Sequence, residues 1–340
     1  MHFGSDNTSG AAPEIIEALA KAAGGYSASY GSDEITKRVE ARLAEIFECE
    51  LSAFLVATGT AANSLALSTY VPPHRAVLCH EESHIHVDEC GAPEFFTHGA
   101  KLVPVGGEAG RITRAALEEA LTFWSSGGVH RQQPALLSLT QQSEAGTLYS
   151  LDELRVLSAL AHEKNMAVHM DGARFANALA ALGCTPAEMS WKAGVDVLCF
   201  GATKNGALGV EAVIFFDSEK ARDFARLRKR GGQLFSKGRF LAAQMEAYLE
   251  GDLWLRLARQ ANEMAALLAA GFQEKGIALA YPAEGNEVFA FLSKEQQRAL
   301  FKAGVQFAPW DIAGENRPLA RFVASFSTEK ADVEAVLRLL

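Results

Sequence analysis

Two polar side chains follow two apolar runs of this sequence, and their types could do chemistry together. Asp171 comes directly after the run 167–170, and Lys204 follows the second run, 195–201. The carboxyl ends of parallel strands form the crevice where ligands bind, so we expect both groups at one sheet edge. A lysine in such a glycine-flanked turn could form a Schiff base with a carbonyl compound. Taken alone, it could equally be a solvated loop lysine.

A third group of residues could hold a phosphate. Thr58-Gly59-Thr60-Ala61-Ala62-Asn63 stands between an apolar run and an Ala/Leu-rich stretch of helical length. Glycine permits a sharp turn, and the start of a helix offers free N–H groups and a positive dipole end. The pattern is neither G-x-G-x-x-G nor a P-loop, which argues against dinucleotides and nucleoside triphosphates. The alternative is a simple strand-to-helix turn with a threonine cap.

Together the three features point to pyridoxal phosphate. A phosphate seat, an aspartate for the pyridinium nitrogen and a lysine for the aldehyde are the parts that hold this cofactor. An anionic Asp171 would keep the ring nitrogen protonated, which makes the ring an electron acceptor. Asp171 could otherwise be a structural cap or an ion-pair partner of Arg174.

Composition restricts the class of protein. The chain has 340 residues, 49% of them hydrophobic, with a net charge of −9 from 41 acidic and 32 basic residues. This balance does not suggest a nucleic-acid partner. No apolar run approaches the roughly 20 residues that cross a bilayer, and the N-terminus lacks a signal-peptide pattern. The five cysteines show no CxxC spacing. We therefore expect a cytoplasmic protein without a disulfide framework or structural zinc.

The elements that must position these groups alternate between strand and helix. We expect strands at 53–58, 76–80, 102–105, 136–140, 167–171, 197–201 and 212–216. This alternation predicts an α/β fold with a mostly parallel sheet between helices. Beyond it, a long helical region over 239–272 with a break at Gly251 leads to short segments typical of a small α+β unit. We expect an N-terminal arm (1–12), a large domain (13–235), and a linking helix with a small C-terminal domain (236–340).

These motifs resemble those of a known family. The chain is similar to the low-specificity L-threonine aldolase group of β-eliminating lyases, within the fold-type-I pyridoxal phosphate enzymes. The resemblance covers essentially the whole chain and rests on Gly4-Ser5-Asp6-Asn7, Tyr30-Gly31, Thr58 to Asn63, His84, Met170 to Arg174, Thr203-Lys204 and Ala320-Arg321-Phe322-Val323. It implies a retro-aldol lyase that cleaves L-threonine, L-allo-threonine or related β-hydroxy-α-amino acids to glycine and an aldehyde. It also implies a homodimer or homotetramer with shared active sites.

The resemblance assigns a role to each matching residue. Lys204 would carry the cofactor as a Schiff base, Asp171 would pair with the pyridinium nitrogen, and His84 would stack on the ring. The remaining cofactor-binding positions would be Gly59, Thr60 and Lys237 at the phosphate, with Arg174 and Thr203 lining the pocket. Ser5 and Arg321 would bind the substrate carboxylate, to which a guanidinium can donate two charge-assisted hydrogen bonds.

The chain departs from the family pattern in two places. Many relatives have an arginine where this chain has Gly4. They also carry a histidine after the strand at 136–140, where this chain has Gln141-Gln142-Ser143-Glu144. The second difference moves the expected general base to His84 or a bound water, with His86 and Glu89 as further candidates.

Three other functions stay open. Another pyridoxal phosphate enzyme, such as a β-eliminating lyase or an aminotransferase, would share the cofactor site, and a non-catalytic descendant would bind without turnover. The stretch His80-Glu81-Glu82-Ser83-His84 spells HExxH, which marks a zinc peptidase only when both histidines lie on one helix face. Because a strand precedes His80, we expect no such helix and no metal.

Overall fold

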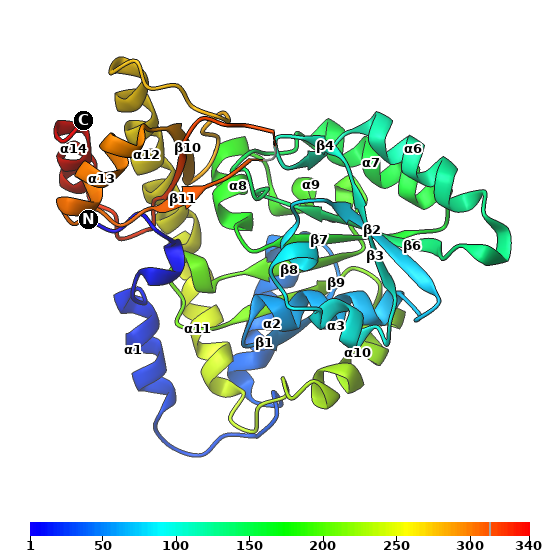
Figure 1. Ribbon diagram of the computed structural model, residues 1–340. Coiled ribbons are helices and arrows are strands. Elements are labelled where there is room, and N and C mark those ends of the chain that lie inside the picture. The colour runs from blue at the N-terminus through cyan, green and yellow to red at the C-terminus, as the bar shows by residue number, and fades with distance from the viewer. Residues whose placement is uncertain (313) are drawn as a thin grey trace.

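The computed structural model describes residues 1–312 and 314–340 (Figure 1). Its main sheet has seven strands in the order β1-β9-β8-β7-β6-β2-β3. Pairing is parallel from β3 through β2, β6 and β7 to β8, while β9 runs antiparallel to both β8 and β1. The mostly parallel sheet is therefore confirmed. Its strands are β1 (Ser52–Val56), β2 (Arg75–His80), β3 (Lys101–Val105), β6 (Gln133–Thr140), β7 (Ala167–Gly172), β8 (Val197–Gly201) and β9 (Glu211–Phe215).

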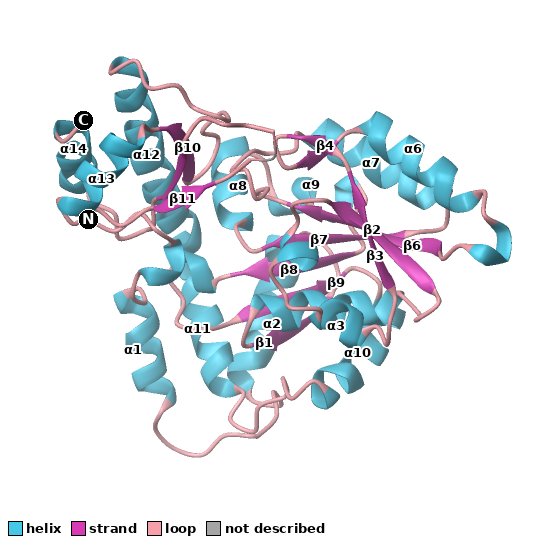
Figure 2. Cartoon of the chain, viewed as in Figure 1, coloured by secondary structure: helices cyan, strands magenta, loops and turns pink. Residues whose placement is uncertain are grey.

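Helices cover both faces of this sheet (Figure 2). The helices α3 (Gly59–Tyr70) and α10 (Ser218–Arg230) pack on one face, with α5 (Ala92–Phe96) against α3. The opposite face is covered by α2 (Glu34–Ile46), α6 (Arg114–Ser125), α7 (Leu151–Glu163), α8 (Phe175–Leu182) and α11 (Arg239–Leu249). Helix α7 begins with the capping box that Ser150 and Glu153 predict. Shorter elements are β4 (Gly107–Glu108), β5 (Arg111–Ile112), α4 (His84–Val87), α9 (Pro186–Met189), η1 (Asp6–Thr8), η2 (Gly128–His130), η3 (Trp191–Ala193) and η4 (Thr203–Asn205).

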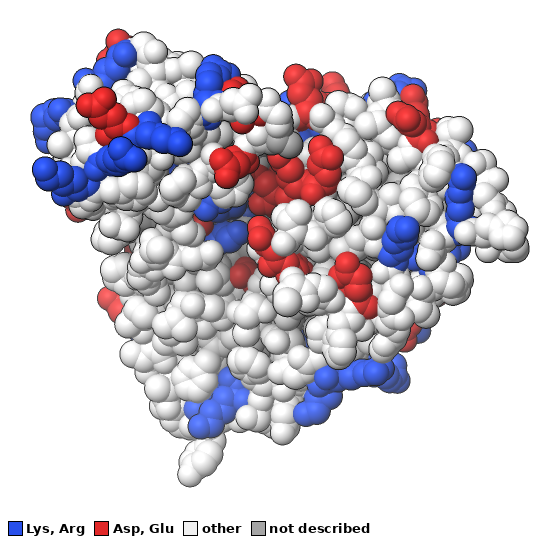
Figure 3. Space-filling model, viewed as in Figure 1, with Lys and Arg blue, Asp and Glu red and all other residues white. Residues whose placement is uncertain are grey.

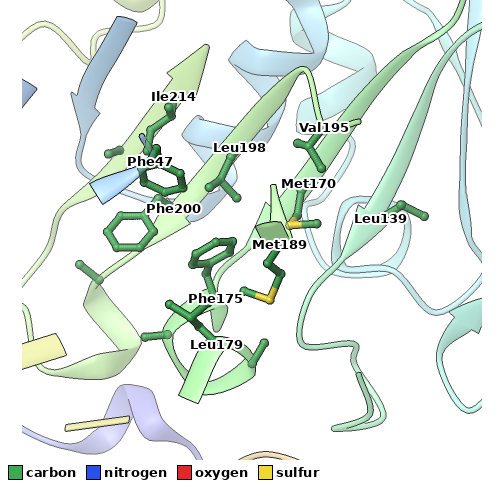
Figure 4. Packing of buried hydrophobic residues seen from close by; sticks show 14 of the residues in the cluster. Phe47, Leu139, Met170, Phe175, Leu179, Met189, Val195, Leu198, Phe200 and Ile214 are labelled. Carbon is green, nitrogen blue, oxygen red and sulfur yellow. The ribbon is translucent and has the colours of Figure 1, made fainter. Parts of the chain in front are cut away.

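An aromatic cluster fixes the end of β8 beside the predicted lysine turn (Figure 4). Phe200 is fully buried, with its ring 6.1 Å from that of Phe47 and 5.7 Å from that of Phe175. Burying an aromatic side chain of this size stabilises a fold by about 1.5–3 kcal/mol. The strand that leads to Lys204 is therefore anchored in the core immediately before the turn begins.

The C-terminal part has a hydrophobic core of its own. A three-stranded antiparallel sheet, β10-β12-β11, packs with α12 and α14. The elements are α12 (Leu253–Glu274), β10 (Glu287–Phe291), α13 (Lys294–Lys302), β11 (Ala308–Trp310), β12 (Leu319–Val323) and α14 (Lys330–Arg338). Before β10, residues 277–281 add only a single isolated bridge, between Leu279 and Ala290. The domain limits drawn from the sequence stay a prediction.

The linking helical region is interrupted where the sequence predicts. Helix α11 ends at Leu249, and α12 begins at Leu253 after the short turn η5 (Glu250–Asp252). Gly251 adopts a φ of 55°, in the left-handed region that glycine enters at little cost.

The N-terminal residues cross to the C-terminal core before joining the large sheet domain. Phe3 is fully buried in that core, its N–H donates to Gln306 O at 2.7 Å, and its carbonyl accepts from Val323 N at 2.8 Å. Helix α1 (Pro13–Ala22) then packs against α11. The first residues are thus held next to β12, where the sequence places Arg321. No helix among the described residues has the length and apolar character needed to cross a membrane.

Candidate active site

A cavity of about 250 Å³ lies at the carboxyl edge of the main sheet, where β6, β7 and β8 end. It brings together seven predicted residues that are far apart in the sequence: Gly59, Thr60, His84, Asp171, Arg174, Thr203 and Lys204. On the molecular surface, Asp and Glu side chains gather around a hollow below the C-terminal helices, and Lys and Arg atoms lie deeper within it (Figure 3). The expectation that successive strand ends present their polar groups to one site is therefore met in the fold.

The predicted phosphate seat lies at the first turn of α3. Thr58 caps the helix, because its Oγ1 accepts a hydrogen bond from Ala61 N at 3.2 Å. The first N–H groups of a helix have no partner within it, and they carry the positive end of the dipole. A Cβ built on Gly59 would meet no atom within 4 Å. The threonine cap and the anion seat are therefore compatible, and open space faces the helix start.

Asp171 is buried and held by two donors. Its Oδ2 accepts from Asn63 Nδ2 at 2.8 Å, and its Oδ1 accepts from Ala173 N at 3.0 Å. Two donors from different parts of the chain therefore fix the orientation of this carboxylate. The alternative that Asp171 pairs with Arg174 is wrong, because Arg174 binds two other carboxylates.

His84 begins α4 and forms a pair with a buried carboxylate. Its Nδ1 lies 2.8 Å from Oε1 of Glu89, whose side chain is fully buried. The hydrogen bond to Glu89 raises the pKa of His84, while burial raises the pKa of Glu89. Both shifts come from the same contact and from burial, so the two side chains form one buried acid–base pair beside the cavity.

The turn that carries Lys204 is anchored from both sides. Asn205 Nδ2 donates to Tyr248 Oη at 2.7 Å and to Trp254 O at 2.8 Å. On the other side, Ala202 N donates to Oε2 of Glu211 at 2.7 Å. Burial raises the pKa of Glu211 to about 7. Lys204 itself is half-buried and lines the cavity, so it is not a solvated loop lysine.

Arg174 closes one side of the cavity through a buried ion-pair network. Its Nε and Nη2 donate to the two carboxylate oxygens of Asp6, at 2.7 and 3.1 Å, and its Nη2 lies 3.4 Å from Oε1 of Glu287. Burial alone would raise the pKa of Asp6, but Arg174 and Lys204 outweigh it and lower that pKa. The arm residue Asp6 thus joins the N-terminus to the site.

The two residues predicted to bind the substrate carboxylate lie beside this network. Arg321 on β12 donates from Nη2 to Gly4 O at 3.4 Å, and its guanidinium lies 4.5 Å from the centre of the Trp310 ring. Its Nε is buried and has no hydrogen-bond partner within the described part of the chain. Ser5 Oγ accepts from Asn7 N at 3.1 Å, and Asn7 lines the cavity.

Lys237 is the one predicted cofactor residue that the fold of a single chain does not bring to the site. It lies in an exposed turn before α11 and is not among the cavity-lining residues.

The HExxH stretch does not form the helix that a zinc peptidase requires. His80 ends β2, and His84 begins α4 after a turn. His80 Nδ1 accepts from Glu82 N at 3.2 Å, which directs this nitrogen to the backbone. Residues 1–312 and 314–340 contain no group of three His, Cys, Asp or Glu that could hold a metal ion. The zinc-peptidase alternative is therefore not supported.

Sequence reasoning missed several site residues. Asn63 and Asp6 belong to motifs that the sequence analysis had already quoted, but nothing in those motifs indicated which partners the two side chains bind. Glu144, which follows the predicted strand at 136–140, also lines the cavity. Glu211 and Glu287 begin strands β9 and β10, and nothing local in the sequence distinguishes them from surface carboxylates.

Comparison with known proteins agrees with this geometry. The family model described as beta-eliminating lyase matches residues 2–295. The low specificity L-threonine aldolase of Pseudomonas aeruginosa is 44% identical over 340 residues, covering 100% of this chain and 96% of that protein. The enzyme of the same description from Pseudomonas sp. is 43% identical and covers 98% and 95%. The structure of Leishmania major threonine aldolase superposes with a TM-score of 0.93 at 28% identity, covering 99% of this chain and 98% of that one.

The fold and its donor groups define a fold-type-I pyridoxal phosphate enzyme. The chain belongs to the β-eliminating lyase family, and within it to the group of low-specificity L-threonine aldolases.

Proposed function

We propose that this protein is a carbon–carbon lyase that cleaves L-threonine, L-allo-threonine or related β-hydroxy-α-amino acids to glycine and an aldehyde. One observation carries the proposal: Lys204, Asp171 and the start of α3 line the same cavity. The descriptions of the relatives as L-threonine aldolases support the substrate class.

The residues present fit pyridoxal phosphate. Gly59 and Thr60 would hold the phosphate at the start of α3, Lys204 would bind the aldehyde carbon, and Asp171 would pair with the ring nitrogen. Thr203 and Arg174 would border the cofactor, and His84 would pack on the ring. When bound, pyridoxal phosphate accepts the electron pair of the breaking Cα–Cβ bond.

The protein's own groups hold the polar side chains of this site in place. Asn63 Nδ2 and Ala173 N donate to the two oxygens of Asp171 and fix this side chain, which would hold a proton on the ring nitrogen of bound pyridoxal phosphate. Asn205 and Glu211 fix the turn on either side of Lys204. The fold therefore restricts the position of the Lys204 side chain before the cofactor binds.

Arg321 and Ser5 would orient the substrate through its carboxylate. The Arg321 guanidinium lies 4.5 Å from the centre of the Trp310 ring and retains a buried Nε without a partner among the described residues. A carboxylate could satisfy this donor in a bidentate contact. Fixing the carboxylate would fix the orientation of the bonds at Cα, so these two residues would select the bond that breaks.

The site is proposed to be completed between copies of the chain in a cytoplasmic homodimer or homotetramer. Lys237 supports this proposal, since it lies outside the cavity of its own chain and is free to reach a partner's phosphate seat. All five cysteines are free, as expected of a reducing compartment. Light scattering of the holoprotein tests the assembly, and an active monomer would contradict it.

The function is tested by product analysis. Protein loaded with pyridoxal phosphate is incubated with L-threonine, L-allo-threonine and phenylserine, and glycine, aldehyde, pyruvate and keto acids are measured. Equimolar glycine and aldehyde are expected. Pyruvate or a keto acid as the main product would instead indicate an eliminating lyase or an aminotransferase.

A further inference from the structure

Glu144 lies on the connection between β6 and α7, and its side chain lines the same cavity as Lys204 and Asp171. Its Oε1 accepts a hydrogen bond from the backbone N–H of His84 at 3.2 Å. This contact fixes one carboxylate oxygen, and the side chain stays partly exposed at the cavity. We propose that Glu144 is the general base that removes the proton from the β-hydroxyl group of the substrate. This inference rests on the proposed aldolase function.

The charges around Glu144 suit a group that exchanges protons near neutral pH. Burial raises the pKa of Glu144 to about 7; Lys204 and Arg174 act against this rise, while Asp171 and Glu287 add to it. A general base is most effective when its pKa lies near the working pH. Glu144 can therefore accept a proton and release it again under the same conditions.

The other titratable groups of the cavity are less suited to this role. The Glu89 carboxylate raises the pKa of His84, so the imidazole is protonated over more of the neutral range and is a poorer acceptor. Glu89 itself is fully buried against His84 and Asn63. Glu211 has a similarly raised pKa, but its Oε2 is committed to Ala202 N beside the lysine turn. Glu211 is therefore a positioning residue for Lys204.

The proposed step balances in atoms and electrons. The Glu144 carboxylate forms a bond to the hydroxyl proton, and the O–H electron pair forms the carbonyl of the aldehyde. The Cα–Cβ bond breaks, and its electron pair stays on the Cα side. After the aldehyde leaves, Glu144 returns its proton to water, and Cα takes up one proton from water to give glycine.

Glu144→Gln tests the step without removing the contact to His84, because a carboxamide oxygen can accept the same hydrogen bond. Two rates are compared in holoprotein: cleavage of L-threonine, and exchange of the glycine α-proton in deuterated water. The exchange reaction uses the same cofactor site, but its substrate, glycine, has no β-hydroxyl group. The expected result is a loss of roughly 10²- to 10⁴-fold in cleavage, with glycine exchange within about threefold of wild type. Cofactor absorbance and thermal unfolding should be unchanged.

Two further variants separate this role from a general effect on the site. Glu211→Ala should slow both reactions, because it removes the acceptor of Ala202 N and so disturbs the turn of Lys204. Glu82→Gln changes a neighbouring carboxylate outside the cavity and should alter neither rate. Cleavage by Glu144→Gln within fivefold of wild type would overturn the inference, as would an equal loss of both reactions in that variant.

The pH profile gives an independent reading. In wild type, kcat/KM for cleavage should fall as pH drops below about 7 because Glu144 becomes protonated. The residual cleavage activity of Glu144→Gln should not show this decrease at acidic pH. If the decrease persists in the variant, Glu144 is not the general base. The proposed function itself, and this inference with it, would be overturned if wild-type protein exchanges the α-proton of glycine but cleaves no β-hydroxy amino acid.

Discussion

Asn63 Nδ2 donates a hydrogen bond to Oδ2 of Asp171 at 2.8 Å. The same group donates to Oε1 of Glu89 at 2.9 Å, and Glu89 holds His84 at 2.8 Å. One amide therefore links the carboxylate proposed to face the cofactor nitrogen with the imidazole proposed to pack on the ring. The two sides of the cofactor site are positioned by a single residue of α3.

Asn63→Ala should weaken this site on both sides. The substitution removes the Asn63 amide, which donates to two buried carboxylates, and an unsatisfied buried group costs about 1–3 kcal/mol. We expect a similar loss in the free energy of unfolding, and weaker binding of pyridoxal phosphate. Denaturant unfolding and absorbance titration measure these effects. Ser64→Ala is the matched control, since its contact to Glu89 is longer, at 3.4 Å. Equal effects of the two substitutions would contradict the bridging role.

Asp171→Asn should separate cofactor binding from turnover. The variant keeps the shape of the side chain and can still accept from Ala173 N, but it cannot hold a proton on the cofactor nitrogen by its charge. Removing one such electrostatic contact typically slows the chemical step by about 10²- to 10³-fold. The cofactor spectrum should persist while threonine cleavage falls by this factor. A rate near that of wild type would exclude the proposed role of Asp171.

Asp6→Asn should reduce stability in a pH-dependent manner. Removing one partner of a buried ion pair costs about 3–5 kcal/mol, and the Asp6 and Arg174 side chains are only 2% and 8% exposed. Because the folded pKa of Asp6 lies below its ordinary value of 3.8, its contribution is present above pH 3.8 and is lost as pH falls through the folded pKa.

Unfolding experiments at several pH values test this prediction. The stability gap between wild type and Asp6→Asn should be full at neutral pH and should shrink below pH 3.8. Asp152→Asn, which breaks an exposed pair with Arg155, should have almost no effect. A gap that stays constant down to strongly acidic pH would mean that folding does not lower the pKa of Asp6.

Glu89→Gln should lower the pKa of His84. The glutamine can still form a hydrogen bond to Nδ1 but does not favour the imidazolium, so the histidine should lose its proton at a lower pH than in wild type. Proton NMR of the His84 ring follows this titration directly. Glu81→Gln, a change outside the cavity, serves as the control. An unchanged His84 titration in Glu89→Gln would show that the pair does not control the charge of His84.

The sequence predicted the sheet and most of the site because both depend on local patterns. The seven main strands lie within a few residues of their predicted positions, and the break at Gly251 was expected from one glycine. Lys204 and Asp171 were predicted because parallel strands present their carboxyl ends at a common edge, and Gly59 because a glycine turn at a helix start can hold an anion. These inferences needed only the order of apolar and polar residues along the chain.

The ion pairs of the site could not be predicted from the sequence. Arg174 was considered as a partner of Asp171, which is close in sequence, but it binds Asp6 and Glu287, which are distant. Which carboxylates Arg174 binds depends on how the N-terminal arm and β10 pack beside the cavity. The raised pKa values of Glu144 and Glu211 also come from burial in the folded chain, which has no local sequence pattern.

The attachment site of the cofactor tests the central claim most directly. Holoprotein is treated with borohydride, digested, and its peptides are mapped by mass spectrometry, with Lys204→Ala as the control. We expect a pyridoxyl group on Lys204 at close to one per chain, and no specific labelling of the variant. Labelling of another lysine in wild type, or full cleavage activity in Lys204→Ala, would contradict the assignment of this residue and the site built around it.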